Sequence, residues 1–104
     1  MRTVMAAVLV LAMVAALASA AQAGVIDRRQ HRQLQRIAAG IRCGDLTRGE
    51  AARLLAEQAW IRLEERYYRS TGGGIEPREW LDLQRDLNRA SRHIYRQRHD
   101  AQRR

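Results

Sequence analysis

The sequence has little that could break a helix or cross-link the chain. It contains one proline, Pro77, and one cysteine, Cys43, among 104 residues. A single cysteine cannot form a disulfide within the chain, which leaves an idle or buried thiol or pairing with another chain. No segment alternates between apolar and polar residues as a half-buried strand does. These absences predict an all-α fold.

The sequence also lacks the patterns that accompany catalysis and metal binding. It has no nucleophile elbow, no glycine-rich phosphate loop that opens a helix and no cysteine–histidine signature. His93 and His99 are six residues apart, whereas ligand pairs on one helix face need a spacing of three or four. His31 is remote from both in the sequence. We therefore expect no enzymatic activity, no metal and no other cofactor.

The first 23 residues are typical of a secretory signal peptide. A basic residue precedes an apolar run over 4–18, and small residues end the segment. This run of about 15 residues is shorter than the roughly 20 that a stable transmembrane helix needs. We expect cleavage after Ala23, or after Ala20, and a periplasmic or secreted location. The remaining residues, 24–104, then form one small helical domain with a thin core.

Positive charge lies at the two ends of this domain. Residues 24–48 carry six arginines and two acids, residues 49–79 five arginines and six acids, and residues 80–104 seven arginines and three acids. An exported chain with basic ends is attracted to anionic lipid headgroups, lipopolysaccharide or acidic proteins rather than to nucleic acid. The alternative is a solvated, salt-screened surface that binds nothing specific. The candidate interaction residues are Cys43, Arg28, Arg29, Arg32, Arg36, Arg92 and Arg96.

A first helix is predicted over residues 27–39. Asp27 and Gln30 have the spacing of a capping box, in which each side chain satisfies a free backbone amide. Gly40 is the predicted end, because glycine tolerates the left-handed conformation that closes many helices. Leu34, Ile37 and Ile41 supply a narrow apolar stripe.

A second helix is predicted over residues 47–69. Thr47 and Glu50 form the Thr-x-x-Glu pattern of a capping box. Its apolar residues fall on two nearly opposite faces, which predicts a central helix with a neighbour on each side. One face holds Ala51, Leu54, Leu55, Ile61 and Tyr68, and the other holds Trp60, Leu63 and Tyr67.

A third helix is predicted over residues 77–101. Pro77 suits a first helical turn, and Glu79 occupies the position that Glu50 has in the preceding helix. Apolar residues then recur at spacings of three and four, as in a short coiled-coil seam. This pattern predicts a homodimer contact through Trp80, Leu83, Leu87 and Ile94.

The two loops belong to a repeat of 29 residues, which relates Gly44 to Gly73 and Glu50 to Glu79. The helices therefore form two overlapping helix–loop–helix units that share the middle helix. The second half of each loop is similar to an EF-hand. Calcium also needs oxygen ligands early in the loop, where this sequence has Ala39, Ile41 and Cys43, and then Tyr68, Ser70 and Gly72. The repeat is better explained as a turn followed by a capped helix.

Four stretches of the chain carry a resemblance to small exported proteobacterial proteins of unknown function. They are "IDRRQHRQLQRIAAGI", "GDLTRGEAARL", "EQAWI" and "SRHIYRQRHD". This resemblance spans most of residues 26–101 and implies a periplasmic location and helical hairpins. The Leu-Thr-x-x-Glu segment at Leu46, Thr47 and Glu50 also resembles the Leu-Thr-x-x-Gln motif of the Spy/CpxP periplasmic chaperones.

Together these features predict an exported, non-enzymatic helical protein that acts as a structural or interaction module. The alternative functions are a periplasmic stress chaperone of the Spy/CpxP kind and a degenerate EF-hand-like calcium-binding protein.

Overall fold

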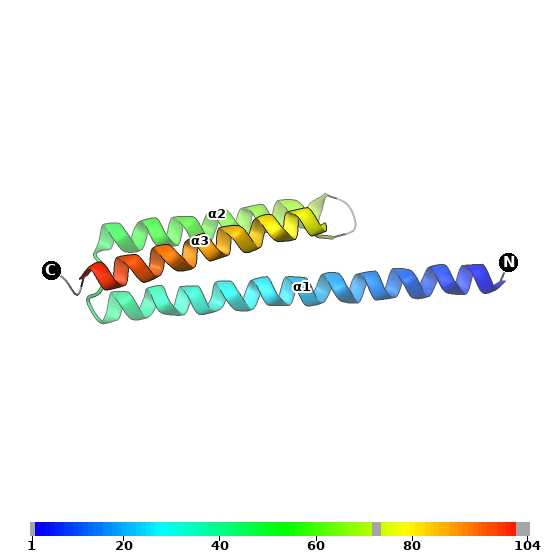
Figure 1. Cartoon of the computed structure of the whole chain (residues 1–104), viewed down its shortest axis with the longest axis horizontal. Coiled ribbons are helices and arrows are strands. Elements are labelled where there is room, and N and C mark those ends of the chain that lie inside the picture. The colour runs from blue at the N-terminus through cyan, green and yellow to red at the C-terminus, as the bar shows by residue number, and fades with distance from the viewer. Residues whose placement is uncertain (1, 72–73, 102–104) are drawn as a thin grey trace.

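The computed structural model describes the backbone of residues 2–71 and 74–101, and the side chains of residues 4–10, 13, 24–71 and 74–100. This part of the chain holds three α-helices and no strand: α1 (Arg2–Arg42), α2 (Arg48–Ser70) and α3 (Pro77–Ala101). Each helix packs against the other two. The hairpin of α2 and α3 lies along the C-terminal half of α1 (Figure 1).

The N-terminal half of α1 extends beyond the hairpin as a single helix (Figure 1). Its described side chains, those of residues 4–10 and 13, are all exposed. The first buried side chain along the described part of α1 is that of Ile26. Among the described residues, no helix is long and apolar enough to cross a membrane.

Helix α1 is longer than the sequence predicts. A helix over 27–39 that opens with a capping box of Asp27 and Gln30 is wrong for the full chain, because the helix already begins at Arg2. A capping residue needs non-helical backbone angles, and no proline interrupts the chain before Asp27. Gln30 is instead 1% exposed, and its side-chain nitrogen donates to the Gln58 carbonyl over 3.4 Å.

Two glycines shape the turn after α1 in different ways. Gly44 has φ +76°, a left-handed conformation that glycine adopts without strain. Gly40 does not end the helix as predicted, because α1 continues to Arg42. A Cβ atom on Gly40 would lie 2.7 Å from Leu46 Cδ1, so the missing side chain makes room for Leu46. The Leu46 amide also donates to the Gly40 carbonyl over 3.2 Å.

Helices α2 and α3 begin with the predicted capping residues. The Glu50 amide donates to Thr47 Oγ1, and the Thr47 amide donates to Glu50 Oε1, both over 3.2 Å, which completes the capping box. Pro77 is the first residue of α3, where a missing amide proton costs nothing. The amide of the preceding Glu76 donates to Glu79 Oε1 over 3.1 Å.

The core consists of two apolar clusters with a layer of buried glutamines between them. Gln58 Nε2 donates to Gln33 Oε1 over 2.6 Å, and Gln33 Nε2 donates to the Leu87 carbonyl over 2.9 Å. This layer therefore connects all three helices. One cluster contains Ile26, Ile61, Ile75, Leu83, Leu87 and Ala90, and the other contains Ile37, Leu46, Ala51, Leu54 and Ile94.

The apolar stripe of α3 lies inside the bundle. Leu83, Leu87 and Ile94 are 0% exposed, and Trp80 packs against the first cluster. The predicted homodimer contact through Trp80, Leu83, Leu87 and Ile94 is therefore wrong, since the last three side chains are fully buried within the chain and Trp80 is partly buried against the first cluster. A stripe with spacings of three and four fits a coiled-coil seam and a monomer core equally well.

Helix α2 is not the central helix that its two apolar faces predict. Ala51, Leu54 and Ile61 are buried, but Trp60, Leu63 and Tyr67 on the other face are between 58% and 65% exposed. Because each of the three helices packs against the other two, no helix is enclosed on both sides. One apolar face of α2 is therefore left in solvent.

Candidate anion-binding face

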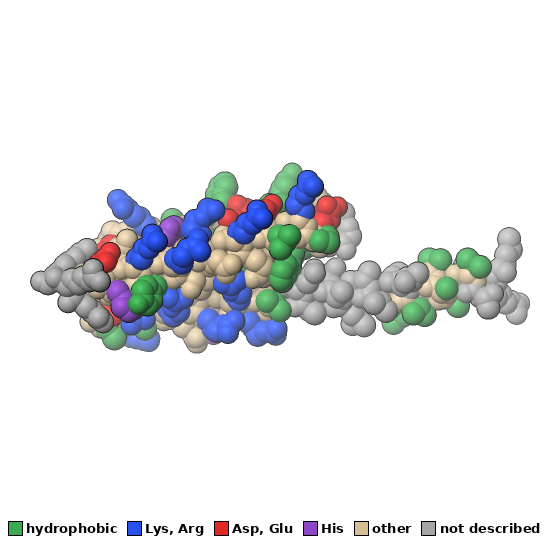
Figure 2. Space-filling model, viewed as in Figure 1, with side chains coloured by type: hydrophobic (Ala, Val, Ile, Leu, Met, Phe, Trp, Pro, Cys, Tyr) green, Lys and Arg blue, Asp and Glu red, His purple; other side chains and the backbone are tan. Residues whose placement is uncertain are grey.

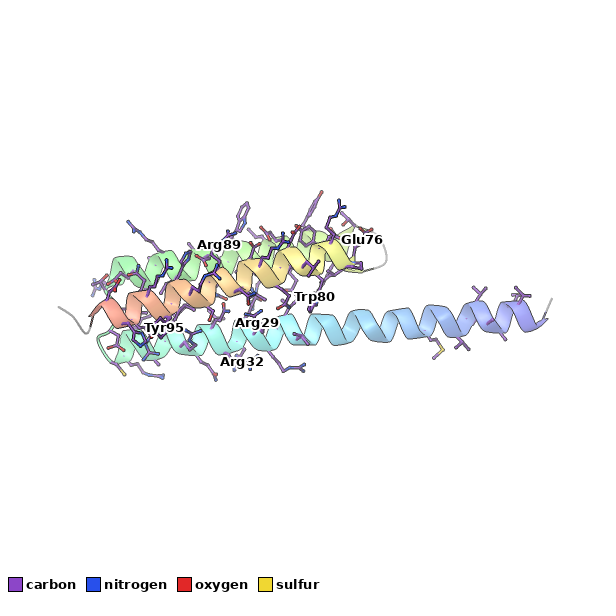
Figure 3. All side chains as sticks on the ribbon, viewed as in Figure 1. Arg29, Arg32, Glu76, Trp80, Arg89 and Tyr95 are labelled. Atoms are coloured by element: carbon purple, nitrogen blue, oxygen red, sulfur yellow. The ribbon has the colours of Figure 1, made fainter. Side chains whose placement is uncertain are left out.

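Arginines from α1 and α3 gather where these two helices pack together. We call this surface the α1–α3 face and define it by Arg29, Arg32, Arg36, Arg92 and Arg98. Helical spacing places Arg29, Arg32 and Arg36 on one side of α1. Figure 2 shows arginine side chains spread over both helices on the viewed face, and Figure 3 shows Arg29 between the two ribbons.

Arg29 is held across the helix interface by two neutral side chains. Its Nη1 donates to Gln84 Oε1, and its Nη2 donates to Asn88 Oδ1 over 2.8 Å. Both acceptors belong to α3 and are side-chain amides, so neither neutralises the guanidinium charge. The forked guanidinium is thus fixed in place with its positive charge uncompensated by these contacts.

Arg36 lies about two turns further along α1 and is held in the same manner. Its Nη1 donates to Ser91 Oγ over 2.8 Å, and its Nη2 donates to the Ser91 carbonyl over 3.2 Å. Arg98 of α3 approaches from the other side and donates to the Arg36 carbonyl over 3.4 Å. Arg98 alone among these three guanidiniums meets a carboxylate within the described residues, that of Asp45 at 3.1 Å.

The electrostatics of these arginines reflect their crowding. Burial lowers the pKa of Arg29, and the neighbouring charge of Arg32 lowers it further. Burial likewise lowers the pKa of Arg36, with Arg98 as the second cause. Both groups remain charged, because an arginine guanidinium is not deprotonated in proteins. The α1–α3 face therefore holds positive charges close together, and a bound anion would reduce the repulsion between them.

Four of the predicted arginines, Arg28, Arg32, Arg92 and Arg96, point into solvent. None of them forms an ion pair with a carboxylate in the described part of the chain. Arg92 lies one turn beyond Asn88, the residue that contacts Arg29, which brings it to the border of the α1–α3 face. These side chains are accessible to an external anion.

The other residues singled out in the sequence lie outside the α1–α3 face. Asp27 lies 3.8 Å from Arg69 of α2, and Arg69 also pairs with the buried carboxylate of Glu65. Burial raises the pKa of Glu65, and the charge of Arg69 lowers it. Cys43 is exposed in the turn after α1 and is a free thiol. Gly72 and Gly73, in the second loop of the 29-residue repeat, lie outside the described residues.

The acids gather on the opposite side of α3, where it packs against α2. Trp60 Nε1 donates to Glu64 Oε1 over 2.7 Å, and His93 Nδ1 lies 2.7 Å from Glu57 Oε2. The pKa of Glu64 is raised to about 7, chiefly by burial. A hydrogen bond with Asp86 and the negative charge of Asp86 act in the same direction. Among the described residues, no group of three or more histidine, cysteine or acidic side chains is arranged to hold a metal ion.

The groups that hold Arg29 and Arg36 were not predicted from the sequence. Gln84, Asn88 and Ser91 follow one another at spacings of four and three, directly beside the apolar stripe of α3. Amide and hydroxyl side chains that border an apolar stripe lie at the edge of a helix interface, where they can accept hydrogen bonds from the neighbouring helix. No family model, curated protein or solved structure matches this chain.

Proposed function

We propose that this chain is an exported, non-enzymatic protein that binds an anionic envelope surface through the α1–α3 face. The observation that carries this proposal is that Arg29 and Arg36 are fixed by neutral acceptors, so their charges remain available. Each arginine close to an anionic membrane contributes about 1 kcal/mol. Several arginines on one face together make such binding stable, and salt weakens it.

Export is part of the same proposal. The first 23 residues have the pattern of a cleaved signal peptide. The described side chains before Gly24 are exposed, and the first buried one is Ile26. Cleavage after Ala23 would therefore leave the two core clusters intact, and the released domain keeps every arginine of the α1–α3 face. The mass of the exported product tests this step.

Binding is tested by co-sedimentation of the protein with vesicles of phosphatidylcholine alone and with vesicles that also contain phosphatidylglycerol. We expect binding to the anionic vesicles only, and loss of binding at high salt. The double variant Arg32→Gln/Arg92→Gln should bind about 30-fold more weakly, because it removes two surface charges of about 1 kcal/mol each.

The matched control is Arg62→Gln/Arg66→Gln, which removes two exposed arginines from α2 and lowers the net charge by the same amount. We expect this control to weaken binding by less than about threefold, since α2 lies outside the α1–α3 face. Equal losses in the two double variants would show that total charge, and not this face, governs binding.

A chaperone function is the second proposal, and the exposed apolar face of α2 favours it. Trp60, Leu63 and Tyr67 are each more than half exposed, and exposed apolar groups of this size are the usual contacts for unfolded clients. Suppression of the aggregation of a reduced or heated client protein tests the idea. Undiminished aggregation at a tenfold excess of this protein would exclude it.

A further inference from the structure

The solvent face of α2 presents an apolar anchor pattern. Trp60, Leu63 and Tyr67 are 63%, 58% and 65% exposed and follow one another at spacings of three and four. With Glu64 and Tyr68 they line a cavity of about 310 Å³. Anchors at i, i+3 and i+7 are the pattern by which one helix packs against another amphipathic segment. The surface is therefore shaped for an apolar side chain of a partner.

Acids from two helices border this apolar pattern on the side toward α3. Glu57 and Glu64 come from α2, and Asp86 comes from α3; together with Trp60 and His93 they line a second cavity of about 310 Å³. Arg89 lines it as well and lies 3.8 Å from Asp86. We call the two cavities and their lining residues the acidic–aromatic edge. Figure 2 shows acidic side chains next to hydrophobic ones along the upper border of the view.

Two carboxylate oxygens on this edge lack an N–H donor. Glu57 Oε1 and Glu64 Oε2 are buried and accept from no N–H group within the described residues. Their companion oxygens are occupied by His93 and by the indole of Trp60. The hydrogen bond between Glu64 and Asp86 joins two carboxyl groups, so it exists only while one of them carries a proton. A buried carboxylate oxygen without a donor is unfavourable. N–H groups from outside the described chain would supply the missing donors to these oxygens.

Carboxylates outnumber arginines around Glu64, although the whole chain carries a formal charge of +8. Burial and then the nearby charges of Glu64, Asp82, Glu79 and Asp86 raise the pKa of Tyr68. The pKa of Glu64 is raised to about 7, so near neutral pH this crowded set of carboxylates retains part of one proton. A bound cation would take the place of that proton.

We infer that the acidic–aromatic edge binds a cationic amphipathic segment of a partner protein. Apolar side chains of the segment lie on Trp60, Leu63 and Tyr67, and a lysine or arginine donates to Glu57 and Glu64. An acidic segment would face three carboxylates, and a purely apolar one would leave both oxygens without an N–H donor. The inference is independent of anion binding at the α1–α3 face, which lies on the other side of α3.

Binding is measured with a synthetic amphipathic helix of leucine and lysine, and with the same peptide carrying glutamate in place of lysine. The protein carries Trp80→Phe, so that Trp60 is the only tryptophan and reports on the edge. We expect a saturable change in Trp60 fluorescence with the lysine peptide and at least tenfold weaker binding of the glutamate peptide. Equal affinity for the two peptides overturns the inference.

Two variants locate the site. Glu64→Gln removes the charge but can still accept from Trp60, and it should weaken binding of the lysine peptide about tenfold at pH 8. The matched control Leu81→Ala removes a side chain of α3 that is 52% exposed and lines neither cavity, and it should leave the affinity unchanged. An unchanged affinity in Glu64→Gln would contradict the proposed contact.

The pH dependence separates this site from a neutral apolar patch. The groups that face Glu64 are Glu57, Trp60 and Tyr68 on α2, and Asp82, Arg85, Asp86, Arg89 and His93 on α3. Affinity for the lysine peptide should fall several-fold from pH 8 to pH 6 as Glu64 gains a proton, and this fall should be smaller in Glu64→Gln. Calorimetry in two buffers of different ionisation enthalpy should show proton release at pH 7. No proton release, or self-association of the protein in place of peptide binding, would overturn the inference.

Discussion

The α1–α3 face and the acidic–aromatic edge lie on opposite sides of α3 and hold their charges in different ways. On the α1–α3 face, neutral amides and a hydroxyl orient Arg29 and Arg36. On the acidic–aromatic edge, carboxylates crowd together, and burial with Asp86 raises the pKa of Glu64. The comparison shows that crowding affects the two types of group differently: an arginine keeps its charge, whereas a crowded and partly buried carboxyl group retains a proton near neutral pH.

The two surfaces also differ in their apolar content. At the α1–α3 face, Leu83, Leu87 and Ile94 of α3 are fully buried, and Tyr95, one turn beyond Ser91, is exposed. At the acidic–aromatic edge, α2 exposes Trp60 and Leu63 by more than half of their surface. One surface is therefore suited to a charged layer, and the other to a side chain that has both an apolar and a charged part.

The largest expected effect tests whether the apolar face of α2 is in solvent. Leu87→Ala removes a side chain that is 0% exposed and should lower the free energy of unfolding by about 3 kcal/mol. Leu63→Ala removes the same group from a position that is 58% exposed and should change it by less than about 0.5 kcal/mol. Urea unfolding monitored by circular dichroism measures both values. A large loss in Leu63→Ala would place that face in an interface.

A smaller effect separates an arginine with neutral partners from one in an ion pair. Arg29→Gln removes two interhelical hydrogen bonds and should cost about 1 kcal/mol of unfolding free energy. Arg89→Gln removes an exposed ion pair to Asp86 at 3.8 Å and should cost at most about 0.5 kcal/mol. The same urea titration compares the two variants. Equal costs would mean that the Arg29 contacts do not hold α1 against α3.

The smallest expected effect concerns pH and Glu64. Its folded pKa of about 7 lies above the ordinary value of 4.5, so the folded state binds more protons than the unfolded state between these values. This contribution to stability is present below pH 4.5 and is lost as the pH rises through 7. Because Glu64 is partly exposed, screening limits the change to about 1 kcal/mol or less.

The test compares urea midpoints of the wild type and Glu64→Gln at pH 5 and pH 8. The difference between the two proteins should move in favour of the variant as the pH rises, since glutamine does not lose a proton. A difference that is the same at both pH values would show that Glu64 titrates as it does in the unfolded chain.

The sequence was sufficient to predict the bounds of α2 and α3 but not the start of α1. Thr47, Glu50 and Pro77 are local signals, and the observed bounds of 48–70 and 77–101 agree closely with the predicted 47–69 and 77–101. The start of α1 was misplaced because Asp27 and Gln30 have the spacing of a cap, while nothing before them stops the helix. A local pattern permits a cap, but the backbone conformation of the preceding residues decides whether one forms.

The candidate sites show the same division between what local sequence patterns predict and what the packing of the helices decides. The sequence by itself determined that the chain is helical and that it is rich in arginine. Only the tertiary structure decided that Arg29 and Arg36 hold α1 against α3, that Gln30 is buried in the core, and that the second apolar face of α2 is exposed. The physical reason is that helical periodicity places residues on a face, whereas the number and position of packed helices decide what covers that face.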